Sequence, residues 1–405
     1  MKIILLSGGS GKRLWPLSNN QRSKQFIRIL KNGLIEESMV ERVWRQIKSL
    51  NLEDSVYIAT GYEQKNILKN QLDIKEDKII TEPFRRDTFP AISLACTYLY
   101  SNQKVDPNEI IFVLPVDPFV ETIFFEKLFD LEKLIVEKNL KLGLIGVNPI
   151  IPSEKYGYIV PERESKYKVK YFEEKPKKEV ALKLIKDKAL WNAGVFGFKL
   201  NTILKLLKER GYSLDYETLI HDYNKLPPVS FDYEFTEKQN SIGFVKYNGF
   251  WKDLGTWNTL TEEMGDTKFG YKSDFLDSTN SHIINETDLP IAAIGVHNLI
   301  IAAGPEGILV SNKEDSPRVK ELDANFFSSI NYTEEEWGIK KRLYNNGNSA
   351  IFLCEMFSNK KMKLKLEKNE RIIKISGDGS ITKMDNEVDI ISIEDFTYIV
   401  IKELD

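Results

Sequence analysis

Short continuous apolar runs alternate with segments of helical spacing through the first half of the chain. Three of the runs are typical of buried strands: Lys2–Leu6, Ser55–Thr60 and Ile110–Leu114. Three segments are predicted to be helices: Glu36–Leu50, which is amphipathic, Glu63–Leu72 and Thr88–Tyr100. Strands that alternate with helices in this way predict βαβ units. We therefore expect an α/β fold with a Rossmann-like, mostly parallel sheet and helices on both faces.

The pattern of apolar and polar positions changes after about residue 265. Residues 266–290 are polar and rich in turn formers, and short apolar runs between glycines follow them. From about residue 331 the chain is rich in lysine and its apolar runs are short. We expect three parts: a large α/β domain at 1–265, a β-rich connector at 266–325 and a small β domain with short strands at 326–405.

The composition narrows the class of protein. Charged residues make up 29% of the 405 residues and the net charge is −3, which argues against nucleic-acid binding. The apolar start is too short for a signal peptide, and no run approaches the roughly 20 apolar residues that span a bilayer. The two cysteines, Cys96 and Cys354, are expected to be buried free thiols, as in a reducing compartment. We expect a cytoplasmic protein without nucleic-acid or membrane partners.

The stretch LLSGGSGKRLWPLS at residues 5–18 follows the first predicted strand and suggests a phosphate-binding loop. It is not a Walker A loop, because Arg13 stands where that motif has a hydroxyl residue and Leu6 stands where it has its first glycine. It is not a dinucleotide-binding turn either, because Leu14 replaces the third glycine. An ordinary glycine turn is the remaining simple interpretation. Glycines at this position also let backbone N–H groups approach a phosphate, and Arg13 adds a cation beside them.

The wider spacing, G-x-G-x-R-x-x-P-x-S from Gly9 to Ser18 with Lys24 six residues later, resembles the signature of sugar-1-phosphate nucleotidylyltransferases. The longer form with K-Q-F at 24–26 resembles the mannose-1-phosphate guanylyltransferase branch of that family. Further stretches resemble the same family in the expected order: EPFRRDTFPAISLA (82–95), VLPVDPFV (113–120), YGYIV (156–160), FEEKP (172–176), LWNAGVFGF (190–198) and GFWKDLGTW (249–257). The resemblance implies the nucleotide-diphospho-sugar transferase fold.

The resemblance also implies a reaction and a site. A sugar 1-phosphate would attack the α-phosphorus of a nucleoside triphosphate, with GTP and α-D-mannose 1-phosphate as the expected substrates and GDP-mannose and pyrophosphate as products. The implied nucleotide-binding residues are Leu6, Ser7, Gly8, Gly9, Gly11, Lys12, Arg13, Lys24, Glu82, Arg86, Asp87, Pro90 and Ala91. The implied sugar-phosphate side comprises Tyr156, Gly157, Glu174, Lys175, Asn192 and Gly194. By the same resemblance Asp117 and Asp253 hold Mg²⁺, and the catalytic residues are Arg13, Lys24, Asp117 and Lys175.

Each motif on its own has a simpler interpretation. Asp117 could cap a helix that starts near Pro118, Glu-Lys-Pro at 174–176 could be a surface turn, and Asn192 could lie in a packing turn. Their occurrence together in one order favours the family. Two other functions stay open: transfer to another base or hexose 1-phosphate, and a catalytically silent subunit that senses nucleotide sugars.

The sequence departs from the family pattern at three places. Lys12 stands where the family usually has threonine, Arg22-Ser23 where it has Tyr-Pro, and Pro118 where it often has histidine. These changes lie close to the expected nucleotide and bear on base and sugar preference.

The tail differs from that of longer relatives, which carry a C-terminal cupin barrel with phosphomannose isomerase activity. Trp337-Gly338 lies in a stretch that resembles the opening of that barrel, but no histidine follows His297. Such an isomerase holds its metal largely through histidines. We therefore expect a shortened cupin-like tail without isomerase activity, and a homodimer formed through the C-terminal β region. Residues 266–325 resemble the family's β-helical segment.

Overall fold

The computed structural model describes residues 1–9, 11–327, 330–367, 369–384 and 387–403. The chain divides into two compact units. Unit 1 comprises Met1–Gly8, Met39–Lys65 and Ile74–Leu254, and unit 2 comprises Gly9–Ser38, Asn66–Asp73 and Gly255–Asp405. The boundaries expected at residues 265 and 325 stay predictions.

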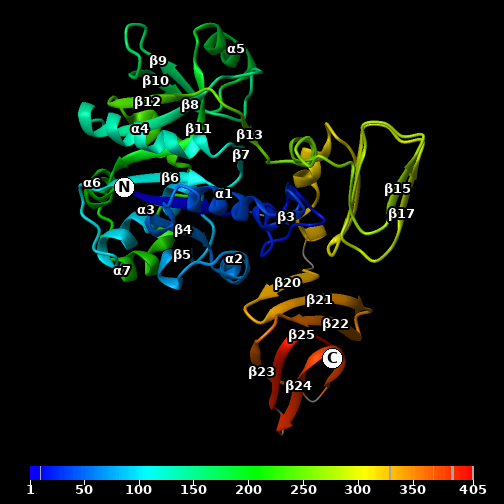
Figure 1. Cartoon of the computed structure of the whole chain (residues 1–405). Coiled ribbons are helices and arrows are strands. Elements are labelled where there is room, and N and C mark those ends of the chain that lie inside the picture. The colour runs from blue at the N-terminus through cyan, green and yellow to red at the C-terminus, as the bar shows by residue number, and fades with distance from the viewer. Residues whose placement is uncertain (10, 328–329, 368, 385–386, 404–405) are drawn as a thin grey trace. The chain divides into compact units, whose positions relative to one another are not determined.

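Unit 1 is built on a nine-stranded sheet whose centre is parallel (Figure 1). Strand β1 (Lys2–Ser7) lies between β4 (Val56–Gly61) and β6 (Ile110–Pro115), and β4 pairs with β5 (Ile79–Glu82), all in parallel register. The carboxyl ends of these strands meet at one edge, which is where ligands bind in sheets of this type. The three predicted strands therefore exist as expected.

The rest of this sheet is mixed in direction. Strand β11 (Leu190–Lys199) runs antiparallel to β6, β8 (Leu142–Val147) and β9 (Tyr158–Pro161). Two edge strands complete it: β10 (Val169–Glu173), antiparallel to β9, and β12 (Ile242–Tyr247), parallel to β8. A separate two-stranded ribbon joins β7 (Pro118–Val120) and β13 (Trp251–Asp253). The expected α/β class is confirmed, with parallel pairing concentrated at the centre of the sheet.

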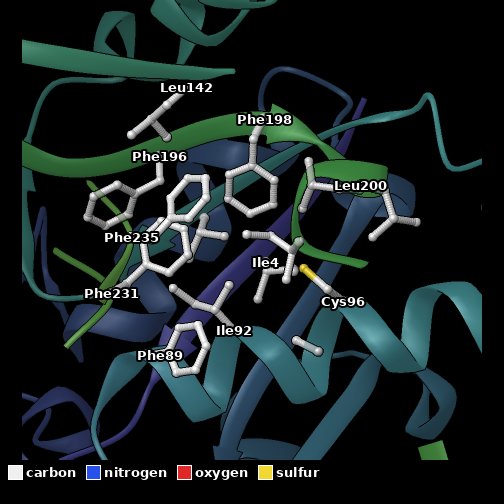
Figure 2. Close-up of a cluster of buried hydrophobic side chains, with 14 of the residues drawn as sticks. Ile4, Phe89, Ile92, Cys96, Leu142, Phe196, Phe198, Leu200, Phe231 and Phe235 are labelled. Atoms are coloured by element: carbon white, nitrogen blue, oxygen red, sulfur yellow. The ribbon is translucent and has the colours of Figure 1, made fainter. Parts of the chain in front are cut away.

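Helices pack against this sheet, and α3 lies at the main core. The helices of unit 1 are α1 (Met39–Lys48), α3 (Thr88–Ser101), α4 (Ile123–Lys138), α5 (Lys178–Lys186), α6 (Leu200–Glu209), α7 (Tyr216–His221) and α8 (Phe231–Glu234). Ile92 and Cys96 of α3 point toward Ile4 of β1 and Phe198 of β11 (Figure 2). Cys96 is buried and free as expected. This apolar layer fixes the strand ends that carry the site.

Unit 2 contains the connector and the tail. Near its start a hairpin joins β2 (Leu30–Asn32) and β3 (Ile35–Glu37). Most of α2 (Lys65–Gln71) and the short α9 (Trp257–Thr261) also belong to it. Two of the predicted helices are shorter than expected: Ile35–Glu37 is a strand, so α1 starts at Met39, and Tyr62–Gln64 is a 3₁₀ turn before α2.

The connector consists of short strands in two sheets (Figure 1). One contains β14 (Lys268–Gly270), β16 (His282–Asn285), β18 (Leu299–Gly304) and β19 (Gly307–Asn312), the other β15 (Ser273–Leu276) and β17 (Ile291–Ile294). Parallel pairs join β14 to β16, β16 to β18 and β15 to β17. Successive parallel pairing in two sheets is the pattern of a β-helix.

The tail is a six-stranded antiparallel sheet. Its strands are β20 (Tyr332–Glu335), β21 (Gly338–Asn345), β22 (Ser349–Met356), β23 (Lys361–Lys365), β24 (Glu370–Met384) and β25 (Glu387–Glu403). The expectation of short strands is wrong for β24 and β25, which have 15 and 17 residues. Register shifts at 374–376 and 377–379 let β24 continue through its glycines. Cys354 is buried and free in the tail core, as expected. In the part of the chain that the structure describes, no helix is long and apolar enough to cross a membrane.

Candidate active site

The expected nucleotide residues of unit 1 begin at the carboxyl end of β1. Leu6 pairs with Ala59 and Pro115, and the Thr60 hydroxyl donates to the Ser7 carbonyl oxygen at 2.9 Å. Gly8 faces the carboxylate of Glu82, since a Cβ on Gly8 would lie 3.6 Å from Glu82 Oε1. The structure therefore brings Leu6, Ser7, Gly8 and Glu82 together at the ligand-binding edge of the sheet.

Glu82 is held in place by a residue that the sequence did not single out. Glu82 is 7% exposed, and its carboxylate accepts a hydrogen bond of 2.6 Å from the hydroxyl of Tyr223. Burial raises the pKa of Glu82, and the bond from Tyr223 opposes that rise. Arg86 is tied to the same segment, because its Nε donates to the carbonyl oxygen of Leu226 at 2.9 Å. No motif marks Tyr223, which is 141 residues from its partner.

The other residues of this stretch form the start of α3. Asp87 has a φ of +70° and its side chain accepts a hydrogen bond of 2.7 Å from the backbone N–H of Thr88. Pro90 and Ala91 are buried in the first turn of the helix. The contacts that Arg86, Asp87, Pro90 and Ala91 make with a nucleotide stay a prediction.

The two expected metal ligands lie on the ribbon of β7 and β13. Asp117 immediately precedes β7, and Asp253 pairs with Pro118 across the ribbon. Since Pro118 begins a strand, the alternative that Asp117 caps a helix there is wrong. Burial raises the pKa of the Tyr156 hydroxyl, and the charges of Asp253 and Asp117 raise it further. The ribbon thus brings the two carboxylates to one place, beside Tyr156.

These carboxylates fit a divalent cation. Hard cations such as Mg²⁺ take carboxylate oxygens, and one or two carboxylates with water and phosphate oxygens complete the shell. The described residues contain no group of three or more histidine, cysteine, aspartate or glutamate side chains that could hold a metal ion. An ion bound by two aspartates keeps open positions for phosphate oxygens.

Helix α1 anchors the ribbon. The carbonyl oxygen of Val120 accepts hydrogen bonds from Arg42 Nη2 at 3.0 Å and from Gln46 Nε2 at 2.8 Å. The Arg42 guanidinium also lies 4.0 Å from the centre of the Phe119 ring. At the other side, Glu121 accepts hydrogen bonds from the Tyr247 hydroxyl and the Phe250 backbone. These contacts fix the position of the carboxylates and were not foreseen from sequence.

The expected sugar side forms one connected cluster. The backbone N–H of Asn192 donates to the Gly157 carbonyl oxygen at 2.8 Å, and the Gly194 N–H donates to Asn192 Oδ1 at 3.2 Å. A Cβ on Gly157 would overlap the ring of Phe172 and the carboxylate of Glu174, so a larger residue here would displace these side chains. Glu174 is 8% exposed, so the Glu-Lys-Pro stretch is not an ordinary surface turn.

Lys175 supplies the cation of this cluster. Its Nζ lies 2.7 Å from Glu174 Oε1, and its backbone has a φ of +44°. Burial alone would lower the pKa of Lys175, but the bond and charge of Glu174 outweigh it and raise that pKa. Lys175 is therefore charged at neutral pH and is half-exposed, as a phosphate-binding lysine requires.

Asp232 belongs to the same cluster and was missed by the sequence reasoning. Its Oδ1 accepts a hydrogen bond of 3.3 Å from Asn192 Nδ2. Burial and the nearby charge of Glu174 raise the pKa of Asp232 to about 7. In the sequence it is an acidic residue in the first turn of the short helix capped by Ser230, where acidic residues are common for structural reasons.

The remaining expected residues belong to unit 2. Gly9 packs against Ser23 and Gln25, and Lys24 opens a 3₁₀ turn at Lys24–Phe26. Gly11 has a φ of +65°, and a Cβ there would overlap the backbone of Asn19. Arg13 is exposed, whereas Lys12 Nζ lies 5.0 Å from the centre of the Phe327 ring. The structure thus groups Gly9, Gly11, Lys12, Arg13 and Lys24 in one folded loop.

Comparison with known proteins agrees with this geometry. The family model for nucleotidyl transferase matches residues 2–268, and the chain belongs to the nucleotidyl transferase family. Within it, the chain resembles a mannose-1-phosphate guanylyltransferase of Klebsiella pneumoniae, at 30% identity over 78% of this chain and 72% of the relative. It also resembles the alginate biosynthesis protein AlgA of Pseudomonas aeruginosa, at 26% identity over 98% of this chain and 89% of the relative.

A solved structure shows the same fold. It is described as a mannose-1-phosphate geranyltransferase from Thermus thermophilus, and it matches with a TM-score of 0.67 and 27% identity. The match covers 79% of this chain and 97% of that protein. The family expected from the motifs is therefore confirmed. Members of this family act on a nucleoside triphosphate and a sugar 1-phosphate and generally use a divalent metal.

Proposed function

We propose that this chain is a mannose-1-phosphate guanylyltransferase, which transfers GMP from GTP to α-D-mannose 1-phosphate and releases pyrophosphate. The observation that carries the proposal is the arrangement of unit 1. Paired carboxylates lie beside Tyr156, and the buried Glu174 and Asn192 with the half-exposed Lys175 supply the polar groups for a sugar phosphate. The choice of guanine and mannose rests on the names of the relatives.

The reaction joins two anions. An oxygen of the sugar phosphate forms a bond to the α-phosphorus, the bond from that phosphorus to the bridging oxygen breaks, and pyrophosphate leaves with the electron pair. Such transfers depend on positioning and on neutralisation of charge, and no covalent enzyme nucleophile is needed. Mg²⁺ is the ion we propose for Asp117 and Asp253, where it would withdraw negative charge from the phosphate oxygens.

The protein side chains have separate roles in this proposal. Lys175 binds the phosphate of mannose 1-phosphate. The Glu174 carboxylate accepts hydrogen bonds from sugar hydroxyls, and the Asn192 amide donates hydrogen bonds to them. Arg13 and Lys24 neutralise the triphosphate, and Arg13 favours the β- and γ-phosphates that leave. The glycines at 8, 9 and 11 give backbone N–H groups access to phosphate oxygens. A cytoplasmic location and a dimer formed through the C-terminal β region stay predictions.

A substrate panel tests the proposal. The full chain is incubated with Mg²⁺, each of GTP, ATP, UTP, CTP and dTTP, and either mannose 1-phosphate or glucose 1-phosphate, and pyrophosphate release is measured. We expect kcat/KM to be highest for GTP with mannose 1-phosphate. A higher value for another pair would assign a different nucleotidylyltransferase. Binding of GDP-mannose with no release for any pair would identify a sensing subunit and overturn the proposal.

A further inference from the structure

The loop that carries Arg13 and Lys24 is closed on itself. We call its described residues, 9 and 11–25, the signature loop. The Ser18 hydroxyl donates to the Gly11 carbonyl oxygen, and Gly11 packs against the Asn19 backbone. Gly9 packs against Ser23 and Gln25. The shape of the loop around Arg13 and Lys24 therefore depends on the segment from Asn19 to Gln25.

Asn19 fastens this segment to the connector and to the tail. Its Oδ1 accepts hydrogen bonds from the backbone N–H groups of Gln21 and Arg22, at 2.9 and 2.7 Å. Its Nδ2 donates to Glu306 Oε1 at 2.7 Å and to the Tyr332 carbonyl oxygen at 2.8 Å. Glu306 in turn accepts the backbone N–H of Tyr332 at 3.1 Å. One carboxylate thus links the loop to the first strand of the tail.

Arg22 makes a second link, and it is one of the positions where the sequence departs from its family. Its Nη1 and Nη2 lie 2.6 and 2.9 Å from the two carboxylate oxygens of Glu286, and its guanidinium lies 4.8 Å from the centre of the Tyr332 ring. The side chains of Arg22 and Glu286 are 11% and 18% exposed. A planar guanidinium held by a bidentate pair and an aromatic face has one orientation, which a lysine cannot reproduce.

Helix α2 makes a third link within unit 2. Asn66 Nδ2 donates to Glu335 Oε2 at 3.0 Å, and Asn70 Nδ2 donates to Glu334 Oε1 at 3.0 Å. The next residue, Gln71, donates from Nε2 to the carbonyl oxygen of Phe26 at 2.8 Å, just past the signature loop. Strand β20 is therefore bonded at its start to the signature loop and at its end to α2, which contacts the residue that follows the loop.

We propose that Glu286, Glu306 and strand β20 form a brace that holds the signature loop in its triphosphate-binding shape, with Arg22 as its central positioning residue. Arg22 acts through the loop backbone on Arg13 and Lys24, and it is not itself a ligand of the nucleotide. The inference rests on the proposed function, because that function gives Arg13 and Lys24 their role. It assigns the histidine-free tail a task other than isomerase chemistry.

A purely structural role makes a different prediction. If the links served only to attach the tail, breaking them would lower stability and affect both substrates alike. A brace for the signature loop instead alters nucleotide binding and leaves mannose 1-phosphate binding unchanged. The tail offers a matched control in Lys341–Glu355, an ion pair of 2.9 Å that joins the neighbouring strands β21 and β22.

The experiment uses the full chain and compares Arg22→Met, Arg22→Lys, Glu286→Gln, the Arg22→Met/Glu286→Gln double variant and Glu355→Gln. We measure kcat, KM for GTP and for mannose 1-phosphate, the Kd of GTP by calorimetry, and Tm. Displacement of a reacting group by about 1 Å can cost on the order of 100-fold, so we expect Arg22→Met to raise the KM and Kd of GTP about 10- to 100-fold. We expect Arg22→Lys to be intermediate, and the double variant to resemble Arg22→Met, because both changes break one interaction. Glu355→Gln should match the wild type.

The outcomes separate the brace from the proposed function. Unchanged GTP affinity in folded Arg22→Met and Glu286→Gln, or an equal loss for both substrates, would overturn the brace. Should Arg22→Met fail to fold, Arg22→Lys and Glu286→Gln decide in the same way. A wild type that binds GTP but forms no GDP-mannose would overturn the proposed function alone. The Kd values of GTP for the wild type and the variants, measured by calorimetry, would still test whether the brace exists. A wild type that binds no nucleotide overturns both.

Discussion

The sugar-side cluster of unit 1 and the signature loop of unit 2, which we propose bind phosphate groups, hold their side chains in different ways. In the cluster, Glu174, Lys175, Asn192 and Asp232 lie close enough to interact, and burial shifts the pKa values of the two acids. In the loop, Arg13 is exposed, and the backbone is shaped by glycines and by remote partners such as Glu286 and Tyr332. The charge state of the cluster depends on electrostatic interactions between neighbouring side chains. The backbone conformation of the loop depends on contacts with residues that are distant in the sequence.

The largest effect on activity is expected at the paired carboxylates Asp117 and Asp253, because neither the cluster nor the loop can replace a lost metal ligand. Asp117→Ala and Asp253→Ala each remove one of two oxygen donors for the metal, so turnover should fall by roughly 1,000-fold or more while Tm changes little. Pyrophosphate release over a Mg²⁺ titration measures the loss. Asp130→Asn, in an exposed pair with Lys127, is the matched control and should behave as wild type. Near-normal pyrophosphate release by the Asp117→Ala variant would show that Asp117 is not a ligand of the metal.

Lys24 of the signature loop and Lys175 of the cluster test whether the two regions bind different substrates. We expect Lys24→Ala and Lys175→Ala each to lower kcat/KM by about 100-fold or more, because each removes a cation that neutralises a phosphate in the transition state. The loss for Lys24→Ala should fall mainly on the GTP parameters and that for Lys175→Ala mainly on those for mannose 1-phosphate. Steady-state kinetics with each substrate varied in turn checks this. If each variant changed the parameters for both substrates equally, the loop would not be specific for GTP and the cluster would not be specific for mannose 1-phosphate.

The cluster also predicts a pH-dependent stability, which depends on Asp232. The folded-state pKa of Asp232 is raised to about 7 from an ordinary value of 3.8, by burial and then by Glu174. Between these values the folded protein binds more protons than the unfolded chain, so this group makes the free energy of unfolding fall as pH rises, by at most about 1.4 kcal/mol per pH unit. Urea unfolding at pH 5, 6 and 7 measures the slope. Asp232→Asn should flatten it, and an unchanged slope in that variant would contradict the assignment.

The smallest effect is expected at Lys12, whose ammonium group lies over the Phe327 ring. A cation–π contact at a partly exposed site contributes about 0.5–1 kcal/mol, so Lys12→Thr should change kcat/KM for GTP by no more than about fivefold. The same panel of substrates provides the measurement. A loss comparable to that of Lys24→Ala would show that Lys12 binds phosphate directly, against the contact with Phe327.

Much of the candidate site could be proposed from the sequence because its residues lie in contiguous stretches. Strand ends at Ser7 and Pro115, the glycines of the loop, and the stretches that carry Asp117 and Asp253 all follow from motifs of about ten residues each. The long strands β24 and β25 were not foreseen, because lysines and glycines within them resemble turns when local preference alone is considered. Bulges let the sheet continue through those positions.

Local patterns and motifs in the sequence correctly predicted the family, the α/β class and the buried free cysteines. The same motifs predict the residues of the candidate site, and the roles of those residues stay proposals. The partners that position these residues are visible only in the tertiary structure. Tyr223 bonds to Glu82, and Asp232 bonds to Asn192. Helix α1 bonds to the ribbon, and Glu286 and Tyr332 contact Arg22. The partner of Arg22 in Glu286 lies 264 residues away, and no spacing rule connects them. Such contacts arise from long-range packing, because a buried charge must find a partner wherever the fold places one.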